Sequence, residues 1–225
     1  MFIPCRAIVF VPVFIDHPDI HKVRQTLKSI LILFAHPAFE KSRVNKVLVE
    51  GLDQTEGITF HDLYQVYPDM DIDRVYEQAL LERHDVIVFH HPFFWYSSPA
   101  ILKQWQDLVL VHGWAYGKKG QALRGKWFFN AMTTGGPKAF YQNCNQSGHY
   151  SVRQLLAPFE QAATMCSMEY LPPFVVHGTH ALSEQDIFMY QKAYHSFLGL
   201  LRDEKINLAD LKAMDYLNDY PRENP

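Results

Sequence analysis

The chain has 225 residues, of which 48% are apolar and 20% are charged, and its net charge is -3. This length and balance fit one well-packed globular domain and exclude an intrinsically disordered chain. A slightly negative chain lacks the basic surface that nucleic-acid binding requires, so no nucleic acid is expected as a partner. The three cysteines form no CxxC pair, which excludes a disulfide framework or a zinc cluster and favours a reducing compartment, the cytoplasm.

Residues 1–28 differ in pattern from the rest of the chain. An apolar run from Ala7 to Ile15 is interrupted by Pro12 and is too short to span a bilayer. It lacks the small-residue cleavage pattern of a signal peptide. Two interpretations stay open: an appendage to the domain, including an over-extended start of translation, or a β-arm or surface-binding segment. The domain itself is expected at 29–203, with a tail at 204–225.

From Ser29 onward, apolar segments typical of strands alternate with segments of helical periodicity. Strands are expected at 29–35, 58–63, 86–89, 126–132 and 170–176, the last at a sheet edge because it contains two prolines. Helices are expected at 43–52, 73–84, 99–109, 152–166 and 183–202. Val75 and Leu108 are expected on the buried faces of the second and third helices. This alternation predicts an α/β fold: a three-layer sandwich around a five-stranded parallel sheet of order 2-1-3-4-5.

In that order the connections diverge between the first and third strands, and ligands bind at the carboxyl ends of the strands there. The loops after Ala35, His90 and Met132 are therefore expected to meet around a ligand. The adjacent His90 and His91 do not predict a metal site, because successive strand residues point to opposite faces of a sheet. No metal is expected.

The first loop, 35–45, ends at the start of a helix, where backbone N–H groups and the helix dipole favour an anion. His36, Ser42 and Asn45 add side chains that donate hydrogen bonds, so a phosphate fits this loop. The alternative is an ordinary capped helix, with Lys41 and Arg43 as solvated charges.

The second loop is rich in aromatic rings and poor in charge, which favours a planar ligand. Its residues are Pro92, Phe93, Phe94, Trp95 and Tyr96. The alternatives are a plug in the core or a dimer contact.

The third loop contains paired glycines, which let the backbone approach a ring closely. Its residues are Thr133, Thr134, Gly135 and Gly136. Backbone N–H groups in such a turn can stabilise a reduced, anionic cofactor. Tyr141 and His149 follow this turn.

Together these segments resemble the NAD(P)H:quinone oxidoreductase family of flavodoxin-like flavoproteins, especially the ancillary subunits of glutathione-gated Kef potassium-efflux systems. The resemblance covers about Leu27 to Leu201. It is carried by LILFAHP at 31–37 with Ser42 and Asn45, by 91–107, by TTGG at 133–136 and by LPPF at 171–174.

The resemblance implies a flavin whose phosphate lies by His36, Ser42 and Asn45 and whose ring is held by 92–96 and 133–136. The family is divided between FMN and FAD, and the compact size favours FMN. Tyr141 occupies the position of a tyrosine that assists hydride transfer in the family. His149 matches the corresponding histidine only loosely, and a surface or packing role is the alternative.

The activity implied by the resemblance is a ping-pong transfer of a hydride from NAD(P)H, through the flavin, to a quinone or similar acceptor. A homodimer is implied as well, with aromatics such as Trp114 and Tyr116 near the pocket rim, although these residues fit the core equally well. The alternative function is a flavin-bearing regulatory subunit of a Kef-type potassium/proton antiporter, peripheral at the inner face of the membrane. A one-electron carrier fits poorly, because such carriers are strongly acidic.

Overall fold

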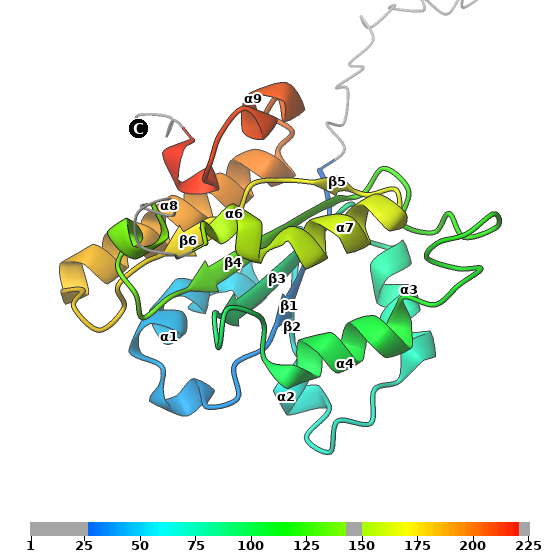
Figure 1. Cartoon of the computed structure of the whole chain (residues 1–225), viewed down its shortest axis with the longest axis horizontal. Helices are drawn as coiled ribbons and strands as arrows, with labels where there is room; N and C mark the ends of the chain where they lie inside the picture. Colours follow the sequence, from blue (N-terminus) through cyan, green and yellow to red (C-terminus); the bar gives the residue numbers. More distant parts are fainter. Residues whose placement is uncertain (1–26, 143–149, 221–225) are drawn as a thin grey trace, which may run out of the picture.

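A parallel sheet of six strands lies at the centre of the molecule, and the computed structural model describes residues 27–142 and 150–220 (Figure 1). The strand order is β2-β1-β3-β4-β5, with β6 also paired to β4. The strands are β1 (Ile30–Phe34), β2 (Ile58–Asp62), β3 (Val86–Pro92), β4 (Trp127–Thr133), β5 (Glu169–Tyr170) and β6 (Phe174–Val176). The order 2-1-3-4-5 predicted from the sequence is confirmed.

Helices cover both faces of the sheet, which makes the fold three layers thick (Figure 1). The helices are α1 (Arg43–Val49), α2 (Leu63–Val66), α3 (Arg74–Glu82), α4 (Ala100–Val109), α6 (Val152–Leu155), α7 (Ala157–Met165), α8 (Glu184–Arg202) and α9 (Leu208–Lys212). Short 3-10 turns are η1 (Phe39–Lys41), η2 (Leu52–Gln54), η3 (Lys138–Tyr141) and η4 (Leu217–Asp219). Buried residues of α3, α4, α6 and α7 form one core with the sheet, and those of α1, α8 and α9 form a second core on its other side.

β1 is buried along its whole length because both faces of the sheet are covered. All five of its side chains are 0% exposed. Leu31 and Leu33 lie in the core with α3 and α4, whereas Ile30, Ile32 and Phe34 lie in the core with α1 and α8. Successive strand residues point to opposite faces, so a strand covered on both sides needs an apolar residue at each position.

Two apolar residues predicted to be buried are exposed. Val75 is 70% exposed and Leu108 is 42% exposed, so the sequence prediction is wrong at both positions. Asp73 caps α3 by accepting hydrogen bonds from the backbone N–H groups of Val75 and Tyr76, which sets the phase of the helix. In that phase Glu77 points inward and Val75 points to solvent.

Prolines and a glycine move three predicted boundaries. The helix expected at 152–166 divides into α6 and α7 at Leu156, where Pro158 lies in the first turn of α7. The strand expected at 170–176 divides into β5 and β6 around Leu171–Pro173, and both parts pair with β4 alone, as expected for an edge. The first helix ends at Val49 instead of residue 52, because Gly51 adopts a left-handed conformation with φ of 79°.

The segment predicted to be a tail packs against the domain over residues 204–220. Leu211 and Leu217 are 0% and 1% exposed. The Asn218 side chain accepts a hydrogen bond from the Val175 backbone N–H (2.8 Å) and donates one to the Val175 carbonyl (3.0 Å). This amide covers the outer edge of β6, where an unpaired strand would otherwise present its backbone. The two interpretations of residues 1–28 concern a segment that lies almost entirely outside the described residues.

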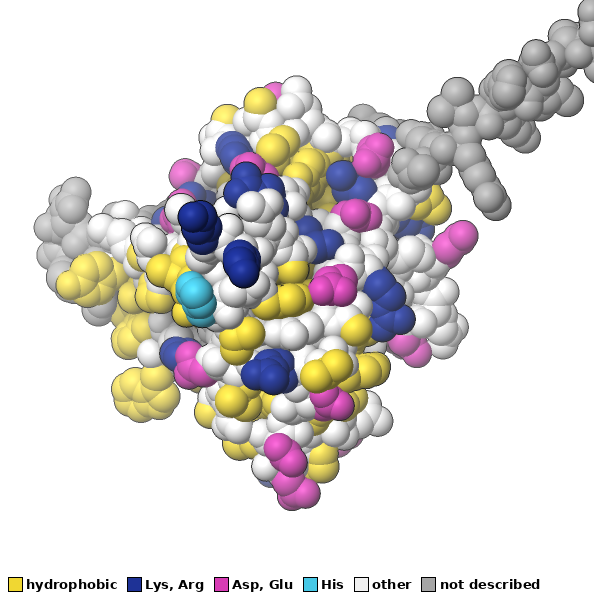
Figure 2. Space-filling model, turned by 90° about the vertical axis from the view of Figure 1, so that its right-hand side faces the viewer, with side chains coloured by type: hydrophobic (Ala, Val, Ile, Leu, Met, Phe, Trp, Pro, Cys, Tyr) yellow, Lys and Arg dark blue, Asp and Glu magenta, His cyan; other side chains and the backbone are white. Residues whose placement is uncertain are grey.

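The described side chains on the face at the right of Figure 1 include charges of both signs. Figure 2 shows Lys and Arg interspersed there with Asp, Glu and apolar residues, so this face has no field of a single sign. Within 27–142 and 150–220, no helix combines the length and apolarity needed to cross a bilayer.

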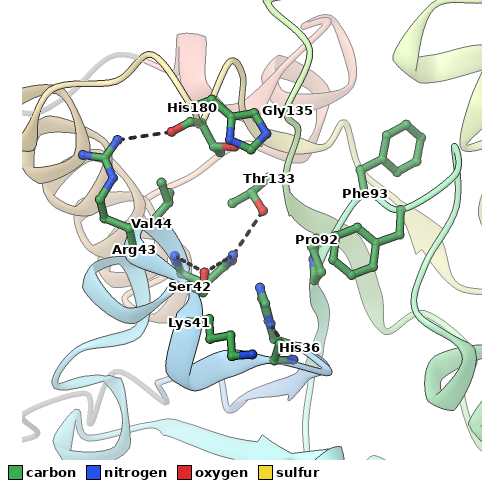
Figure 3. A pocket seen from close by; sticks show the side chains of 14 residues that line it. His36, Lys41, Ser42, Arg43, Val44, Pro92, Phe93, Thr133, Gly135 and His180 are labelled. Atoms are coloured by element: carbon green, nitrogen blue, oxygen red, sulfur yellow. Dashed lines mark hydrogen bonds between the residues drawn. The ribbon is translucent and has the colours of Figure 1, made fainter.

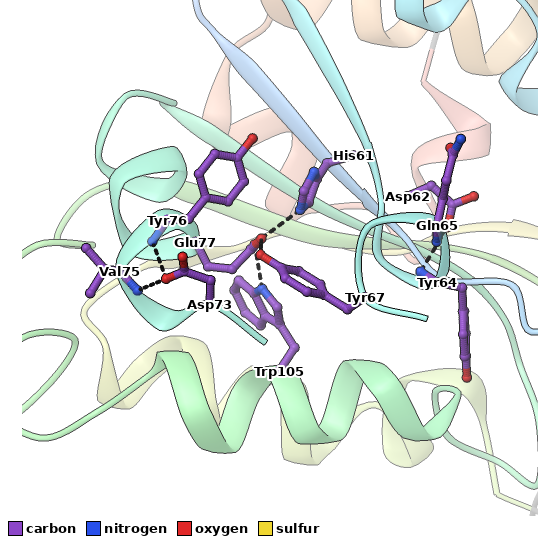
Figure 4. A network of polar contacts seen from close by, with 10 residues as sticks. All are labelled: His61, Asp62, Tyr64, Gln65, Tyr67, Asp73, Val75, Tyr76, Glu77 and Trp105. Atoms are coloured by element: carbon purple, nitrogen blue, oxygen red, sulfur yellow. Dashed lines mark hydrogen bonds and ion pairs between the residues drawn. The ribbon is translucent and has the colours of Figure 1, made fainter. Parts of the chain in front are cut away.

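A buried carboxyl group joins four segments on the α3 and α4 side of the sheet (Figure 4). Glu77 is 0% exposed and accepts hydrogen bonds from His61 Nε2 (2.7 Å), the Tyr67 hydroxyl (2.6 Å) and Trp105 Nε1 (2.7 Å). Burial, and then the hydrogen bond with Glu77, raise the pKa of Tyr67. Trp105 belongs to α4, which directly follows the aromatic loop, so this network fixes the position of that helix.

Replacing Glu77 with alanine is expected to lower the free energy of unfolding by about 3–5 kcal/mol, because three buried donors lose their common acceptor. Urea unfolding followed by circular dichroism measures the change. Lys46→Ala is the control, because Lys46 pairs with Glu40 at the surface and such pairs contribute under about 1 kcal/mol. Equal effects of the two substitutions would contradict a structural role for the network.

Candidate functional site

A cavity of about 380 Å³ opens at the carboxyl ends of β1, β3 and β4 (Figure 3). Its lining residues are His36, Ala38, Lys41, Ser42, Arg43, Val44, Asn45, Pro92, Phe93, Phe94, Thr133, Gly135, Thr179 and His180. The three loops predicted from the topology therefore meet, because parallel strands release their connections at the same edge. The volume lies within the range of about 300–1,000 Å³ that is usual for ligand pockets.

One end of the cavity offers groups that suit an anion. The Ser42 hydroxyl caps α1 by accepting a hydrogen bond from the Asn45 backbone N–H (3.1 Å), and its own proton remains available to a ligand. His36 Nδ1 accepts a hydrogen bond from the Ala38 backbone N–H (3.2 Å), so a neutral His36 carries its proton on Nε2. Burial lowers the pKa of His36, which keeps the ring neutral at pH 7. Lys41 adds a positive charge to this end.

Asn45 connects the first loop to the third. Its Nδ2 donates to Ser42 Oγ (3.0 Å) and to Thr133 Oγ1 (3.2 Å), while its Oδ1 accepts from His90 Nε2 (3.1 Å). Asn45 is 2% exposed, and both of its amide protons are used in these bonds. In this structure Asn45 therefore braces the site, and Ser42, His36 and Lys41 present the groups that face the cavity.

The two histidines at the end of β3 support the site from opposite sides of the sheet. Burial lowers the pKa of His90 to about 3 and that of His91 to about 4, so both rings are neutral. His91 Nε2 accepts from Asn130 Nδ2 (3.1 Å), which leaves Nδ1–H to donate to the Pro92 carbonyl (3.0 Å). This bond fixes the peptide from which the aromatic loop begins.

The aromatic loop is a tight turn in an unusual conformation. Phe94 and Ser97 exchange two backbone hydrogen bonds of 3.0 Å, and the two residues between them, Trp95 and Tyr96, have φ of 48° and 64°. Positive φ at both central positions is the pattern of a type I′ turn, which favours Asn-Gly. Pro92, Phe93 and Phe94 line the cavity, whereas Trp95, at 94% exposed, and Tyr96 project outside it.

The third loop is held by the end of β6. The Thr134 N–H donates to the Val176 carbonyl, and the Thr179 N–H donates to the Thr134 carbonyl. Thr133 and Gly135 face the cavity. A Cβ atom on Gly136 would lie 3.3 Å from the Tyr141 hydroxyl, so glycine permits this close approach.

Tyr141 is not among the residues that line the cavity, but it contacts Phe93 of the second loop, which is. Its ring centroid is 6.4 Å from that of Phe93, and the residue is 6% exposed. Burial raises the pKa of Tyr141, and a hydrogen bond with Thr134 partly opposes the shift. His149, the other predicted catalytic residue, lies outside the described residues.

Sequence reasoning missed the contribution of the loop that follows β6. Thr179 and His180 line the cavity, and Arg43 donates to the carbonyls of Thr179 (3.3 Å) and Leu182 (2.6 Å), which ties that loop to α1. Loops at the carboxyl ends of the first, third and fourth strands are expected to meet around a ligand. The same expectation applied to the loop after the fifth strand would have identified Thr179 and His180.

Comparisons with known proteins agree with this architecture. The pattern of a protein family described as flavodoxin-like fold matches residues 28–198. The glutathione-regulated potassium-efflux system ancillary protein KefG of Salmonella paratyphi B is 44% identical over 171 residues, which are 76% of this chain and 93% of that relative.

Two solved structures resemble the chain over most of their length. General stress protein 14 from Treponema denticola in complex with FMN has 40% identity and a TM-score of 0.72, and the match covers 77% of this chain and 99% of that one. An NADPH-quinone reductase from P. pentosaceus has 30% identity and a TM-score of 0.68, with coverage of 76% and 97%. The family resemblance inferred from the sequence is thus confirmed, and the chain belongs to the flavodoxin-like fold family.

Proposed function

We propose that this chain is a flavin-dependent oxidoreductase that binds FMN in the cavity and passes electrons from NAD(P)H to a quinone-class acceptor. The observation that carries the proposal is the joining of an anion-binding end, an aromatic wall and the Thr133–Gly136 turn within one cavity of about 380 Å³. The FMN complex of general stress protein 14 and the NADPH-quinone reductase support this choice of cofactor and acceptor.

The residues present fit FMN. Its phosphate would lie by His36 Nε2–H, the Ser42 hydroxyl and Lys41, and its ring would lie between the 92–96 loop and the Thr133–Gly136 turn. The bound flavin would supply two-electron chemistry, which no side chain of this site provides. FAD is the alternative cofactor, and the FMN-bound relative favours the smaller one.

Tyr141 is the group that would give a proton to the acceptor as it is reduced. Its hydroxyl lies beside the turn at Gly136, and its ring contacts Phe93, which lines the cavity. Burial keeps the pKa of Tyr141 above its usual value, and the phenol therefore carries its proton at pH 7. NAD(P)H and the acceptor would occupy the same space in turn, in a ping-pong cycle.

A homodimer belongs to the proposal as well. Among the aromatics near the rim, Phe94, Trp95 and Tyr96 are 45%, 94% and 49% exposed. Trp114 and Tyr116 pack against the core instead, as the second interpretation of the sequence allowed. Exposed aromatic side chains are typical of contacts between proteins, so we place the dimer contact at the Phe94–Tyr96 turn. Gel filtration of the purified chain tests this assignment.

The proposed function predicts a yellow protein. The purified chain is expected to show flavin absorption in the visible range, to release FMN that is identified by its mass, and to reduce 1,4-benzoquinone with NADH or NADPH. A colourless preparation that takes up neither FMN nor FAD would overturn the assignment.

Lys41→Ala is expected to weaken FMN binding about tenfold and to leave riboflavin binding unchanged, because only FMN carries a phosphate that attracts the Lys41 ammonium. Fluorescence titration of the flavin-free protein measures both affinities. Lys46→Ala is the matched control, since Lys46 pairs with Glu40 outside the cavity. Loss of riboflavin affinity in Lys41→Ala would show that Lys41 does not act on the phosphate.

Replacing Trp95 and Tyr96 together with Asn-Gly is expected to raise the free energy of unfolding by about 1–3 kcal/mol, because these residues suit positive φ. The same change is expected to leave FMN affinity unchanged, since both rings project outside the cavity. Urea unfolding and flavin titration measure the two effects. A stabilised turn that loses flavin affinity would show that these rings take part in cofactor binding.

KefG supports a second candidate function, a flavin-bearing subunit that regulates a potassium/proton antiporter from the inner face of the membrane. Co-purification with a Kef-type transporter would favour this function. It would be favoured further if a variant that cannot transfer hydride changed the ion flux through the transporter as much as the wild type does. The two functions share the same flavin site, so they differ in what the reduced protein acts on.

A further inference from the structure

His177 is a buried histidine beside the site to which the proposed function gives no role. It follows the last residue of β6, Val176, and is 8% exposed. Its ring centroid lies 5.5 Å from that of Tyr141 and 5.7 Å from that of Tyr216. It therefore stands next to the tyrosine that contacts Phe93 of the cavity wall.

The Thr134 hydroxyl connects His177 to Tyr141. Its oxygen lies 2.8 Å from the Gly136 carbonyl and 3.2 Å from His177 Nδ1, and it also forms a hydrogen bond with Tyr141. A hydroxyl has one proton, and a carbonyl can only accept, so that proton goes to the Gly136 carbonyl. His177 must then donate from Nδ1–H to Thr134 Oγ1.

This assignment leaves His177 Nε2 without a proton. Among the residues that the structure describes, no group lies within hydrogen-bond distance of this buried nitrogen. Buried polar atoms are nearly always paired, and one that is not calls for an explanation. Here an unpaired basic nitrogen stands at the end of a chain of hydrogen bonds that leads to Tyr141.

We propose that His177 returns a proton to Tyr141 through the Thr134 hydroxyl after Tyr141 has protonated the acceptor. This inference rests on the proposed function, because it requires Tyr141 to lose its proton in the reaction.

The proton transfers balance. The Tyr141 O–H bond breaks and its proton bonds to an oxygen of the quinone-class acceptor, which receives its electrons from the NAD(P)H-reduced flavin. The Thr134 hydroxyl turns away from the Gly136 carbonyl and gives its proton to the Tyr141 phenolate. The Thr134 oxygen then takes the proton from His177 Nδ1. One proton from solvent then restores the neutral ring of His177, a residue that is 8% exposed.

The charges around His177 suit a relay. Burial, followed by the positive charge of the exposed Lys138, lowers the pKa of His177 to about 4. Besides Lys138, the titratable groups that face the ring within 27–142 and 150–220 are Tyr141 and Tyr216. A ring with this pKa is neutral at pH 7, so its lone pair is free to accept a proton. The low pKa also disfavours the doubly protonated ring, so a proton that the ring accepts is passed on to Thr134.

The tautomer of His177 tests the arrangement without any reaction. In ¹⁵N spectra of the flavin-free protein labelled at histidine, His177 is expected to carry its proton on Nδ1. Thr134→Val removes the hydroxyl at constant shape and is expected to shift the proton to Nε2, whereas Thr134→Ser is expected to keep it on Nδ1. A wild-type His177 protonated on Nε2 would overturn the inference.

Two acceptors test the relay in the flavin-loaded protein. His177→Phe keeps an aromatic ring and is expected to slow reoxidation by 1,4-benzoquinone roughly 10²-fold in stopped flow. Reoxidation by ferricyanide, which takes electrons without a proton, is expected to slow less than twofold. Thr134→Val, which leaves the histidine in place, is expected to show the same difference between acceptors, and Thr134→Ser is expected to restore the benzoquinone rate.

The outcomes separate the relay from the proposed function. Equal benzoquinone rates in wild type and His177→Phe, or equal slowing with both acceptors, would overturn the relay and leave the oxidoreductase assignment intact. The relay would also be overturned if the effects of His177→Phe and Tyr141→Phe on the rate were fully additive in the double variant. Substitutions of groups in one relay are expected to have non-additive effects. A chain that binds no flavin would overturn the proposed function and the relay with it.

Discussion

The constraint on which the rest of this structure depends is the burial of the parallel sheet on both faces. Because β1, β3 and β4 are covered on both sides, their connections can leave only at the ends of the strands, and parallel strands put those ends on one edge. The backbone then joins the loops: the Phe93 N–H donates to the Thr133 carbonyl, and the Thr134 N–H donates to the Val176 carbonyl. The cavity is the consequence of this convergence.

Neutral histidines hold the site in place from within the two cores. His90 pairs with Asn45 and Tyr194 on the α8 side, and His91 pairs with Asn130 and the Pro92 carbonyl on the α7 side. Burial keeps both rings uncharged, so each nitrogen has a fixed role as donor or acceptor. A site whose supporting side chains have one hydrogen-bonding arrangement is organised before a ligand arrives.

Two departures from the local rules of protein structure lie at this edge of the sheet, and left-handed non-glycine residues also occur at Met70, Ser167 and Glu204. Trp95 and Tyr96 occupy a left-handed turn that suits glycine and asparagine, and His177 keeps a buried nitrogen unpaired within the described residues. At the other end of the sheet and in β1, apolar pattern and burial agree. Departures of this kind concentrate where function is located, because a fold tolerates them only where its other contacts hold them in place.

The sequence by itself determined the strand order and the three loops that meet at the cavity, because periodicity and parallel topology follow from local pattern. It misplaced Val75 and Leu108 and the breaks at Leu156 and Leu171–Pro173, since helix phase and strand division depend on caps and prolines acting within a packed core. Only the tertiary structure decided that Asn45 braces two loops, that Thr179 and His180 line the cavity, and that His177 touches Tyr141. Those relations join residues far apart in the chain, and packing alone brings them together.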